Sequence, residues 1–155
     1  EPAMTPGRGG DGRIGAGIPS VILVVDVANV MGSRPDGWWR DRAGAATRLV
    51  ASLASVRCRE ITCPDGSSVE ADRIVAVVEG RARGVASPED VEVVRAPGSG
   101  DDTIVEVAAD LVGEGRLVAV VTADRGLRAR LPEGVRAFGP RWLRDLLDAA
   151  GPAAP

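Results

Sequence analysis

The sequence predicts an α/β fold, with a mainly parallel central sheet and helices on both of its faces. Short apolar runs rich in β-branched residues alternate with segments whose apolar residues recur at helical spacing, which is typical of βαβ units. The first run, residues 21–25, is apolar throughout, as expected of a central strand buried on both faces. A length of 155 residues fits one domain. We therefore expect a single domain over residues 21–148.

The other elements are expected in order along the chain. From about Trp38 to Ser55, apolar residues at helical spacing predict a long amphipathic helix. The turn signal Pro64-Asp65-Gly66 predicts a small hairpin or excursion outside the core. Further strands are expected at residues 74–78, 91–94 and 117–121, with an edge strand at 135–138. Further helices are expected at residues 101–112, 125–131 and 140–148, the last with a proline in its first turn.

Both ends of the chain are rich in glycine and proline. Residues 1–20 cannot bury enough apolar surface to order themselves, so we expect a flexible tail there and a second loose end at residues 149–155. Residues 1–20 lack the features of a signal peptide, and no apolar stretch approaches the roughly 20 residues of a membrane span. These features predict a cytoplasmic protein without a membrane partner.

Composition excludes several kinds of chemistry. The chain has no histidine, lysine or tyrosine, so a catalytic apparatus that needs an imidazole, an ammonium or a phenol is ruled out. A net charge of −3 would not attract a polyanion by bulk electrostatics. Cys58 and Cys63 alone cannot complete the four-ligand shell of a structural zinc, and we expect reduced thiols. Chemistry here would depend on carboxylates, water and a bound metal.

Four aspartates lie where predicted strands end or predicted helices begin. They are Asp26, Asp101, Asp102 and Asp124. Because parallel strands end, and the following helices begin, on the same edge of such a sheet, these carboxylates should lie close together. Carboxylates about 5 Å apart repel by roughly 3 kcal/mol per pair at an effective dielectric near 20. Mg²⁺ or Mn²⁺, which prefer carboxylate oxygen, would offset this repulsion and activate water for attack on a phosphate ester.

Two further residues are candidates for the same edge. Asn29, three residues beyond Asp26, could orient a ligand or water, or could be a turn residue. Glu79 ends the strand at residues 74–78 and either reaches this edge or pairs with a nearby arginine. The aspartates also have a simpler explanation, because aspartate is common at the start of a helix, where it complements the helix dipole.

A loop rich in arginine and tryptophan follows the first strand. Arginine holds phosphates and indole rings stack on bases, so this loop is a candidate clamp for single-stranded nucleic acid, although at least one tryptophan should pack in the core. Other arginines could contact phosphates on the same rim or could be solvated surface. The candidate RNA-binding residues are Arg34, Trp38, Arg40, Arg81, Arg83, Arg125 and Arg128.

Three motifs together resemble the NYN-domain branch of the PIN-like, metal-dependent ribonucleases. They are Val24-Val25-Asp26-Val27-Ala28-Asn29, Gly100-Asp101-Asp102 and Thr122-Ala123-Asp124. The resemblance covers about residues 21–148 and implies a PIN-like domain with the first strand central. It also implies that the four aspartates are acidic metal-site residues, that Asn29 supports them, and that RNA is cleaved endonucleolytically.

The bacterial proteins that the sequence resembles include ribosome-associated endoribonucleases, which implies translation-linked RNA as the context. Two positions depart from the family pattern: Val27 stands where glycine is usual, and Arg128 stands where some relatives carry another acid.

We therefore predict a Mg²⁺- or Mn²⁺-dependent endoribonuclease that acts on RNA, with single strands as the expected substrate. A nucleotide phosphohydrolase using the same metal site and a non-catalytic RNA-binding module remain the alternatives. The sequence also leaves a homodimer open.

Overall fold

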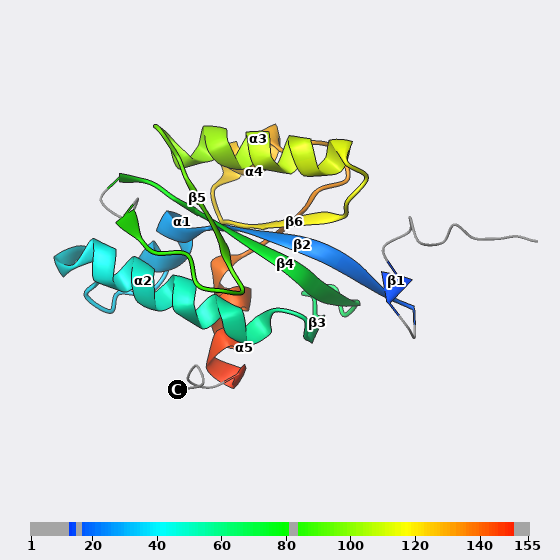
Figure 1. Ribbon diagram of the computed structural model, residues 1–155, viewed down its shortest axis with the longest axis horizontal. Coiled ribbons are helices and arrows are strands. Elements are labelled where there is room, and N and C mark those ends of the chain that lie inside the picture. Colours follow the sequence, from blue (N-terminus) through cyan, green and yellow to red (C-terminus); the bar gives the residue numbers. More distant parts are fainter. Residues whose placement is uncertain (1–12, 15–16, 81–83, 151–155) are drawn as a thin grey trace, which may run out of the picture.

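The computed structural model describes residues 13–14, 17–80 and 84–150. These residues form a mostly parallel sheet with helices on both faces, as predicted (Figure 1). The strands are β1 (Arg13–Ile14), β2 (Ile18–Asp26), β3 (Glu60–Thr62), β4 (Ser68–Val78), β5 (Glu92–Arg95), β6 (Val118–Val121) and β7 (Arg136–Phe138). The helices are α1 (Val27–Gly32), α2 (Arg42–Leu53), α3 (Gly100–Gly113), α4 (Arg125–Arg130) and α5 (Pro140–Ala150), with short 3-10 helices η2 (Trp38–Arg40) and η3 (Ala54–Val56).

Strand β2 lies in the middle of the sheet, between β4 and β6, and is parallel to both. Strands β5 and β7 continue the parallel pairing at β4 and β6, whereas β1 and β3 pair antiparallel with β2 and β4. The chain first adds strands on the β4 side of β2 and then crosses by α3 to β6 on the other side. The strand order therefore reverses beside β2, the position where α/β sheets form their binding crevice.

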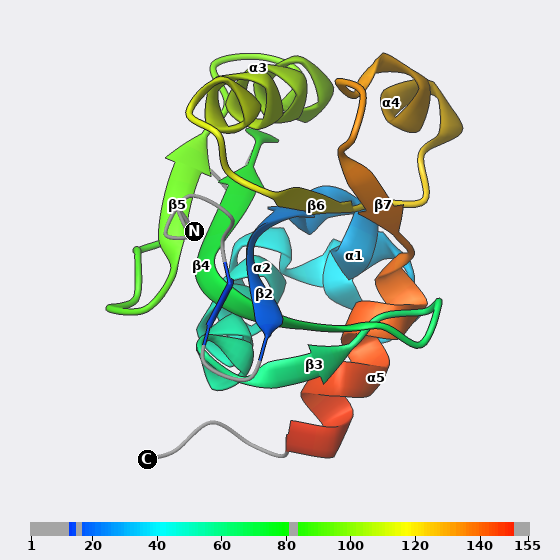
Figure 2. The same cartoon turned by 90° about the vertical axis from the view of Figure 1, so that its right-hand side faces the viewer.

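Successive residues of β2 point to opposite faces of the sheet and enter two separate cores. Leu23 and Val25 pack with α1, α2 and α5, whereas Ile22 and Val24 pack with α3 and α4. The two helical layers are visible above and below the sheet in Figure 1 and again in Figure 2. Burial on both faces explains why residues 21–25 are apolar without alternation.

The expected long helix over residues 38–55 is instead divided into η2, α2 and η3. Gly37 has a φ of 89°, in the left-handed region, and the Asp41 carboxylate accepts a hydrogen bond of 3.0 Å from the Gly44 amide. This cap gives α2 its own start at Arg42. Helix α1 was not predicted from the sequence, because six residues are too few to show helical periodicity.

The hairpin at Pro64-Asp65-Gly66 is present, but its expected position outside the core is wrong. Strands β3 and β4 pair antiparallel across the turn, and Ile61, Cys63 and Val69 are buried in the core under α2 and α5. Strand β4 therefore begins at Ser68, six residues earlier than predicted. The prediction rested on the turn residues and did not take account of the apolar residues on either side of them.

The ends of the domain extend beyond the expected bounds of residues 21–148, because β1 lies at Arg13–Ile14 and α5 continues to Ala150. Strand β2 begins at Ile18, inside the predicted tail of residues 1–20, while residues 1–12 and 151–155 lie outside the described residues. Both cysteines are free, as expected, with Cys58 exposed and Cys63 buried. No helix in the described part of the chain combines the length and apolar character needed to cross a membrane.

Candidate functional site

The carboxyl ends of β2, β4 and β6 and the start of α3 meet at one edge of the sheet. Asp26 is the last residue of β2, Glu79 directly follows β4, and Asp124 follows β6 by three residues. Asp101 lies in the first turn of α3. We call these four residues, Asp26, Glu79, Asp101 and Asp124, the acidic edge. They come from four segments that are distant in sequence and that the crossover through α3 brings together.

Asp26 is the most buried residue of the acidic edge, with 5% of its surface exposed. Its Oδ2 accepts a hydrogen bond of 2.9 Å from the Thr122 hydroxyl, and its Oδ1 accepts one of 3.3 Å from the Asn29 amide nitrogen. The second bond makes Asp26 the N-cap of α1. The short helix thereby fixes the direction of the carboxylate at the end of the central strand.

Thr122 and Asn29 tie the end of β6 to the end of β2. The Thr122 hydroxyl, which donates to Asp26, also accepts a hydrogen bond of 3.1 Å from the Asp124 amide nitrogen. The Asn29 side-chain oxygen accepts one of 2.8 Å from the Ala123 amide nitrogen. The Asn29 side chain therefore links α1 to the loop after β6.

Thr122, fully buried, was not singled out by the sequence analysis as a site residue. Its position two residues before Asp124, at the end of a predicted strand, could have indicated that it belongs to the same edge of the sheet.

Glu79 approaches the start of α3 at Gly100, the residue before Asp101. The Ser99 hydroxyl accepts a hydrogen bond of 3.1 Å from the Asp101 amide nitrogen, so Ser99 and not an aspartate caps this helix. A Cβ added at Gly100 would lie 2.5 Å from Glu79 Oε2, which shows how closely the Glu79 carboxylate approaches the helix. No described residue donates a hydrogen bond to the carboxylate of Asp101 or Glu79.

Asp102 faces a different environment. Its carboxylate forms an ion pair of 2.7 Å with Arg130 of α4, and 65% of its side chain is exposed. Of the two adjacent aspartates, the structure therefore brings only Asp101 toward the other acids. Asp124 also caps a helix, because its Oδ1 accepts a hydrogen bond of 3.0 Å from the Leu127 amide nitrogen of α4.

Two carboxyl groups of the acidic edge are harder to ionise than usual. Burial raises the pKa of Asp26, and the charges of Asp101 and Glu79 add to this effect, against the opposing hydrogen bonds from Thr122 and Asn29. Burial also raises the pKa of Asp101, together with the negative charges of Asp124 and Asp102, while Arg130 opposes the rise. Burial is thus the main reason that both groups resist ionisation, and neighbouring negative charges add to it.

The donor chemistry of the acidic edge fits a hard divalent cation, although the side chains do not form a ready-made metal centre. Within the described residues, no three acidic side chains are gathered closely enough to hold a metal ion as they stand. However, all the available donors are carboxylate oxygens, which Mg²⁺ and Mn²⁺ prefer. Asp101 and Glu79 have no hydrogen-bond donor among the described residues, and no described arginine forms an ion pair with any of the four acids.

The predicted nucleic-acid loop lies between α1 and α2. Trp38 packs against the core, with the Arg42 guanidinium 5.1 Å from its ring centroid, while Trp39 is 50% exposed. Arg40 lies 5.8 Å from the Trp39 ring centroid. The sequence analysis expected one tryptophan of the pair to pack in the core, and it is Trp38.

The other predicted arginines are not equivalent. Arg34 is paired with Asp148 at 3.0 Å, and Arg125 is exposed at the start of α4. Arg128 donates two hydrogen bonds, of 2.9 and 2.7 Å, to the Thr122 carbonyl oxygen, so it stabilises the end of β6. Arg81 and Arg83 lie outside the described residues.

Comparison with known proteins supports the fold. No protein-family model matches the sequence, and a comparison with curated proteins finds no match. Among solved structures, the chain is similar to the crystal structure of a tryptophan-to-leucine mutant of Rae1 (YacP) from Bacillus subtilis. The TM-score is 0.64 and the sequence identity is 20%, over 83% of this chain and 76% of that chain. The likeness confirms the predicted fold class, an α/β domain with a mainly parallel central sheet and helices on both faces.

Proposed function

We propose that this protein is a metal-dependent endoribonuclease that hydrolyses RNA phosphodiester bonds with a water activated at the acidic edge. The observation that carries the proposal is that four acidic residues lie along one edge of the sheet, where the charges of Asp101 and Glu79 act on Asp26 and that of Asp124 acts on Asp101. No described arginine forms an ion pair with them. Such a concentration of negative charge is unfavourable unless protons or cations offset it. The sequence resemblance to NYN-domain ribonucleases supports RNA as the substrate, and the structural likeness to Rae1 supports the fold on which that resemblance rests.

In this proposal, Asp26, Asp101, Asp124 and Glu79 would hold Mg²⁺ or Mn²⁺. When bound, such a cation lowers the pKa of a water molecule and compensates the charge of the phosphate. Asp26 sets the position of the centre, because its strand, its cap and the Thr122 hydroxyl all fix its carboxylate. Asn29 holds the β6 loop against α1 and so keeps Asp124 beside Asp26.

The single-stranded substrate would lie along the loop between α1 and α2. Trp39 offers an exposed ring on which a base can stack, and the adjacent Arg40 adds a positive charge for phosphate. Trp38 supports this arrangement from the core side. Arg125, at the start of α4, can contact phosphate on the other side of the acidic edge. In keeping with the sequence resemblance, ribosome-bound RNA in the cytoplasm is the context that we propose to test.

The test is cleavage of labelled single-stranded RNA by the wild type and by Asp26→Asn, with Mn²⁺ or with EDTA. Asp102→Asn is the matched control, because it removes the same charge from the residue next to Asp101 that is paired with Arg130. We expect cleavage that requires metal. Loss of a residue that only hydrogen-bonds to a metal ligand typically lowers activity by roughly 10–100-fold. Because Asp26 is proposed to bind the metal directly, the cleavage rate should fall further than this in Asp26→Asn. In Asp102→Asn the rate should change little.

The same assay separates the alternatives. Hydrolysis of nucleoside triphosphates without RNA cleavage would indicate a nucleotide phosphohydrolase that uses the same acids. Retention of RNA without turnover of either substrate would indicate a binding module. RNA cleavage in EDTA, or equal cleavage by Asp26→Asn and the wild type, would refute the proposed metal site.

A further inference from the structure

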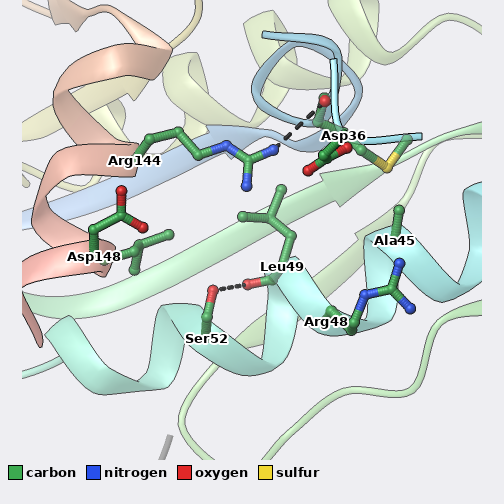
Figure 3. A pocket seen from close by; sticks show the side chains of 9 residues that line it. Asp36, Ala45, Arg48, Leu49, Ser52, Arg144 and Asp148 are labelled. Carbon is green, nitrogen blue, oxygen red and sulfur yellow. Dashed lines mark hydrogen bonds between the residues drawn. The ribbon is translucent and has the colours of Figure 1, made fainter. Parts of the chain in front are cut away.

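A cavity of about 420 Å³ lies between α1, α2 and α5, on the side of the sheet away from α3 and α4 (Figure 3). Its volume is in the range of small-molecule sites, roughly 300–1,000 Å³. Met31, Leu49 and Leu147 give it an apolar floor, and Asp36 and Arg144 lie at its rim. None of these residues belongs to the acidic edge. The cavity is a second concave site, lined by both apolar and charged side chains.

Arg144 reaches over the cavity from α5. Its Nη2 donates a hydrogen bond of 3.1 Å to the Val30 carbonyl oxygen at the end of α1. Its Nε is buried and has no hydrogen-bond partner among the described residues. A buried donor without a partner is rare in folded proteins. The guanidinium is therefore anchored on one side and unsatisfied on another.

Asp36 lies beside this guanidinium at the rim, as Figure 3 shows. The two side chains form no hydrogen bond with each other, and no described residue donates a hydrogen bond to the Asp36 carboxylate. The Asp36 carboxylate thus has unused acceptors beside the Arg144 guanidinium, whose Nη1 donates no hydrogen bond to a described residue. A ligand that has hydrogen-bond donors and acceptors side by side could donate to Asp36 and accept from Arg144.

The charges around the cavity favour a neutral ligand over a phosphate. Asp36 and Asp148 both line it, beside Arg48 and Arg144, and Asp148 is also paired with Arg34. A phosphate placed here would meet two carboxylates, whereas a planar neutral ring would not be repelled and could pack its faces against Leu49 and Leu147. A nucleobase has this combination of apolar faces and polar edges.

Guanine fits the polar rim better than the other bases. Its N7 and O6 are acceptors that arginine recognises in nucleic acids, and its N1 and N2 carry hydrogens that one carboxylate can accept together. Adenine offers a single amino group, and the pyrimidines lack N7. Helix α1 connects this cavity to Asp26 over six residues, about 9 Å of helix, so a base bound here would lie near the acidic edge.

We propose that the cavity between α1, α2 and α5 binds one unstacked guanine base of the RNA strand, close to the bond that is cleaved. The inference rests on the proposed function for its RNA context, and it adds a base preference that the acidic edge cannot supply. Asp36 accepts hydrogen bonds from the base, Arg144 donates to it, and Leu49 packs against its face.

The test is binding of the four nucleoside monophosphates to the wild-type protein in EDTA, by isothermal titration or by NMR titration. We expect GMP to bind most tightly and inorganic phosphate not to compete. In Asp36→Asn, GMP affinity should fall about tenfold or more, and AMP should gain relative to GMP, because the asparagine amide pairs with adenine N6 and N7. Asp110→Asn, on the exposed side of α3 on the other face of the sheet, is the control and should bind like the wild type.

A single-stranded uridine oligomer with or without one guanosine then tests whether the base is read within RNA. Equal affinity for all four monophosphates, no binding of any of them, competition by phosphate, or an unchanged profile in Asp36→Asn would overturn the inference. Mn²⁺-dependent cleavage measured on the same preparations separates the two proposals. Cleavage without GMP binding would refute only the guanine site, whereas GMP binding without cleavage would refute only the nuclease.

Discussion

The acidic residues of this chain fall into two groups that differ in what surrounds them. In one group, six carboxylates on the outer surface form ion pairs with arginine. Arg73 binds Glu92 through two hydrogen bonds of 2.8 Å, and Arg116 binds Asp72 through bonds of 2.9 and 2.7 Å. At the acidic edge, Asp26 and its neighbours have no arginine partner among the described residues. The pKa of Glu92 is accordingly lowered by the hydrogen bond from Arg73, whereas burial raises that of Asp26.

The difference is not a shortage of cations, because the chain has nineteen arginines. Arg130 lies close enough to Asp101 to lower its pKa, yet its ion pair is with Asp102. The acidic edge thus keeps its negative charges without an arginine ion pair, unlike the six paired carboxylates of the outer surface. Unpaired negative charges close together destabilise the folded state unless a cation binds beside them. This arrangement is expected where the compensating cation is a bound ion and not an arginine of the chain.

The largest expected effect is stabilisation by metal. If the acidic edge binds Mg²⁺ or Mn²⁺, a metal concentration 100 times the Kd should raise the free energy of unfolding by about 2.7 kcal/mol. Thermal unfolding with and without metal measures this. Asp26→Asn should lose most of the increase, and Asp102→Asn should retain it. An equal increase in both variants would place the bound metal elsewhere.

The next largest effect is expected when the Thr122 hydroxyl, which connects Asp26 to the loop after β6, is removed. Thr122→Val keeps the shape of the side chain but removes the donor to Asp26 and the acceptor for the Asp124 amide. We expect a loss of about 1–3 kcal/mol in urea unfolding, because these groups are buried. Thr122→Ser should recover most of this stability. A neutral Thr122→Val substitution would show that the hydroxyl does not organise the site.

The two groups of acids should also respond oppositely to pH in EDTA. The folded pKa of Asp26 is raised, so its contribution to stability is fully present below its unfolded pKa and is lost as the pH rises through its folded pKa. Asp26→Asn should therefore be more stable than the wild type at neutral pH, and this advantage should disappear on acidification.

Glu92 provides the matched comparison. Its folded pKa is lowered, so its contribution is present above its unfolded pKa and is lost as the pH falls through its folded pKa. Glu92→Gln should be less stable than the wild type at neutral pH, with the deficit vanishing in acid. Urea unfolding of both variants across the pH range measures the two differences. Differences of the same sign would mean that the two acids share one environment.

The smallest effect is expected for a surface ion pair. Arg73→Ala removes the partner of Glu92, whose side chain is 51% exposed. The expected loss is below about 1 kcal/mol and should shrink further at high salt, because water and ions screen exposed charges. A loss above about 2 kcal/mol in urea unfolding would indicate that the surface pairs carry more of the stability than their exposure implies.

The sequence by itself determined the fold class and the position of the acids along the chain. A continuous apolar run is either a strand buried on both faces or a segment of buried helix. The run at residues 21–25 is short and rich in β-branched residues, which favours the strand. The ends of the strands also placed Asp26 and Asp124 on one edge, since parallel strands end on the same side of a sheet. These features depend on local pattern and on topology, which the order of elements largely sets.

Only the tertiary structure decided which side chains face the acidic edge. Asp101 and Asp102 are neighbours in sequence but lie about 100° apart around α3, and the packing of Ile104 and Ala108 against the sheet fixes which of them points inward. The same holds for Trp38 and Trp39, of which only the second remains exposed. Thr122 and Glu79 join the site through contacts between distant segments. Local pattern gives the period of an element, whereas its rotation against the core is set by residues far away in the chain.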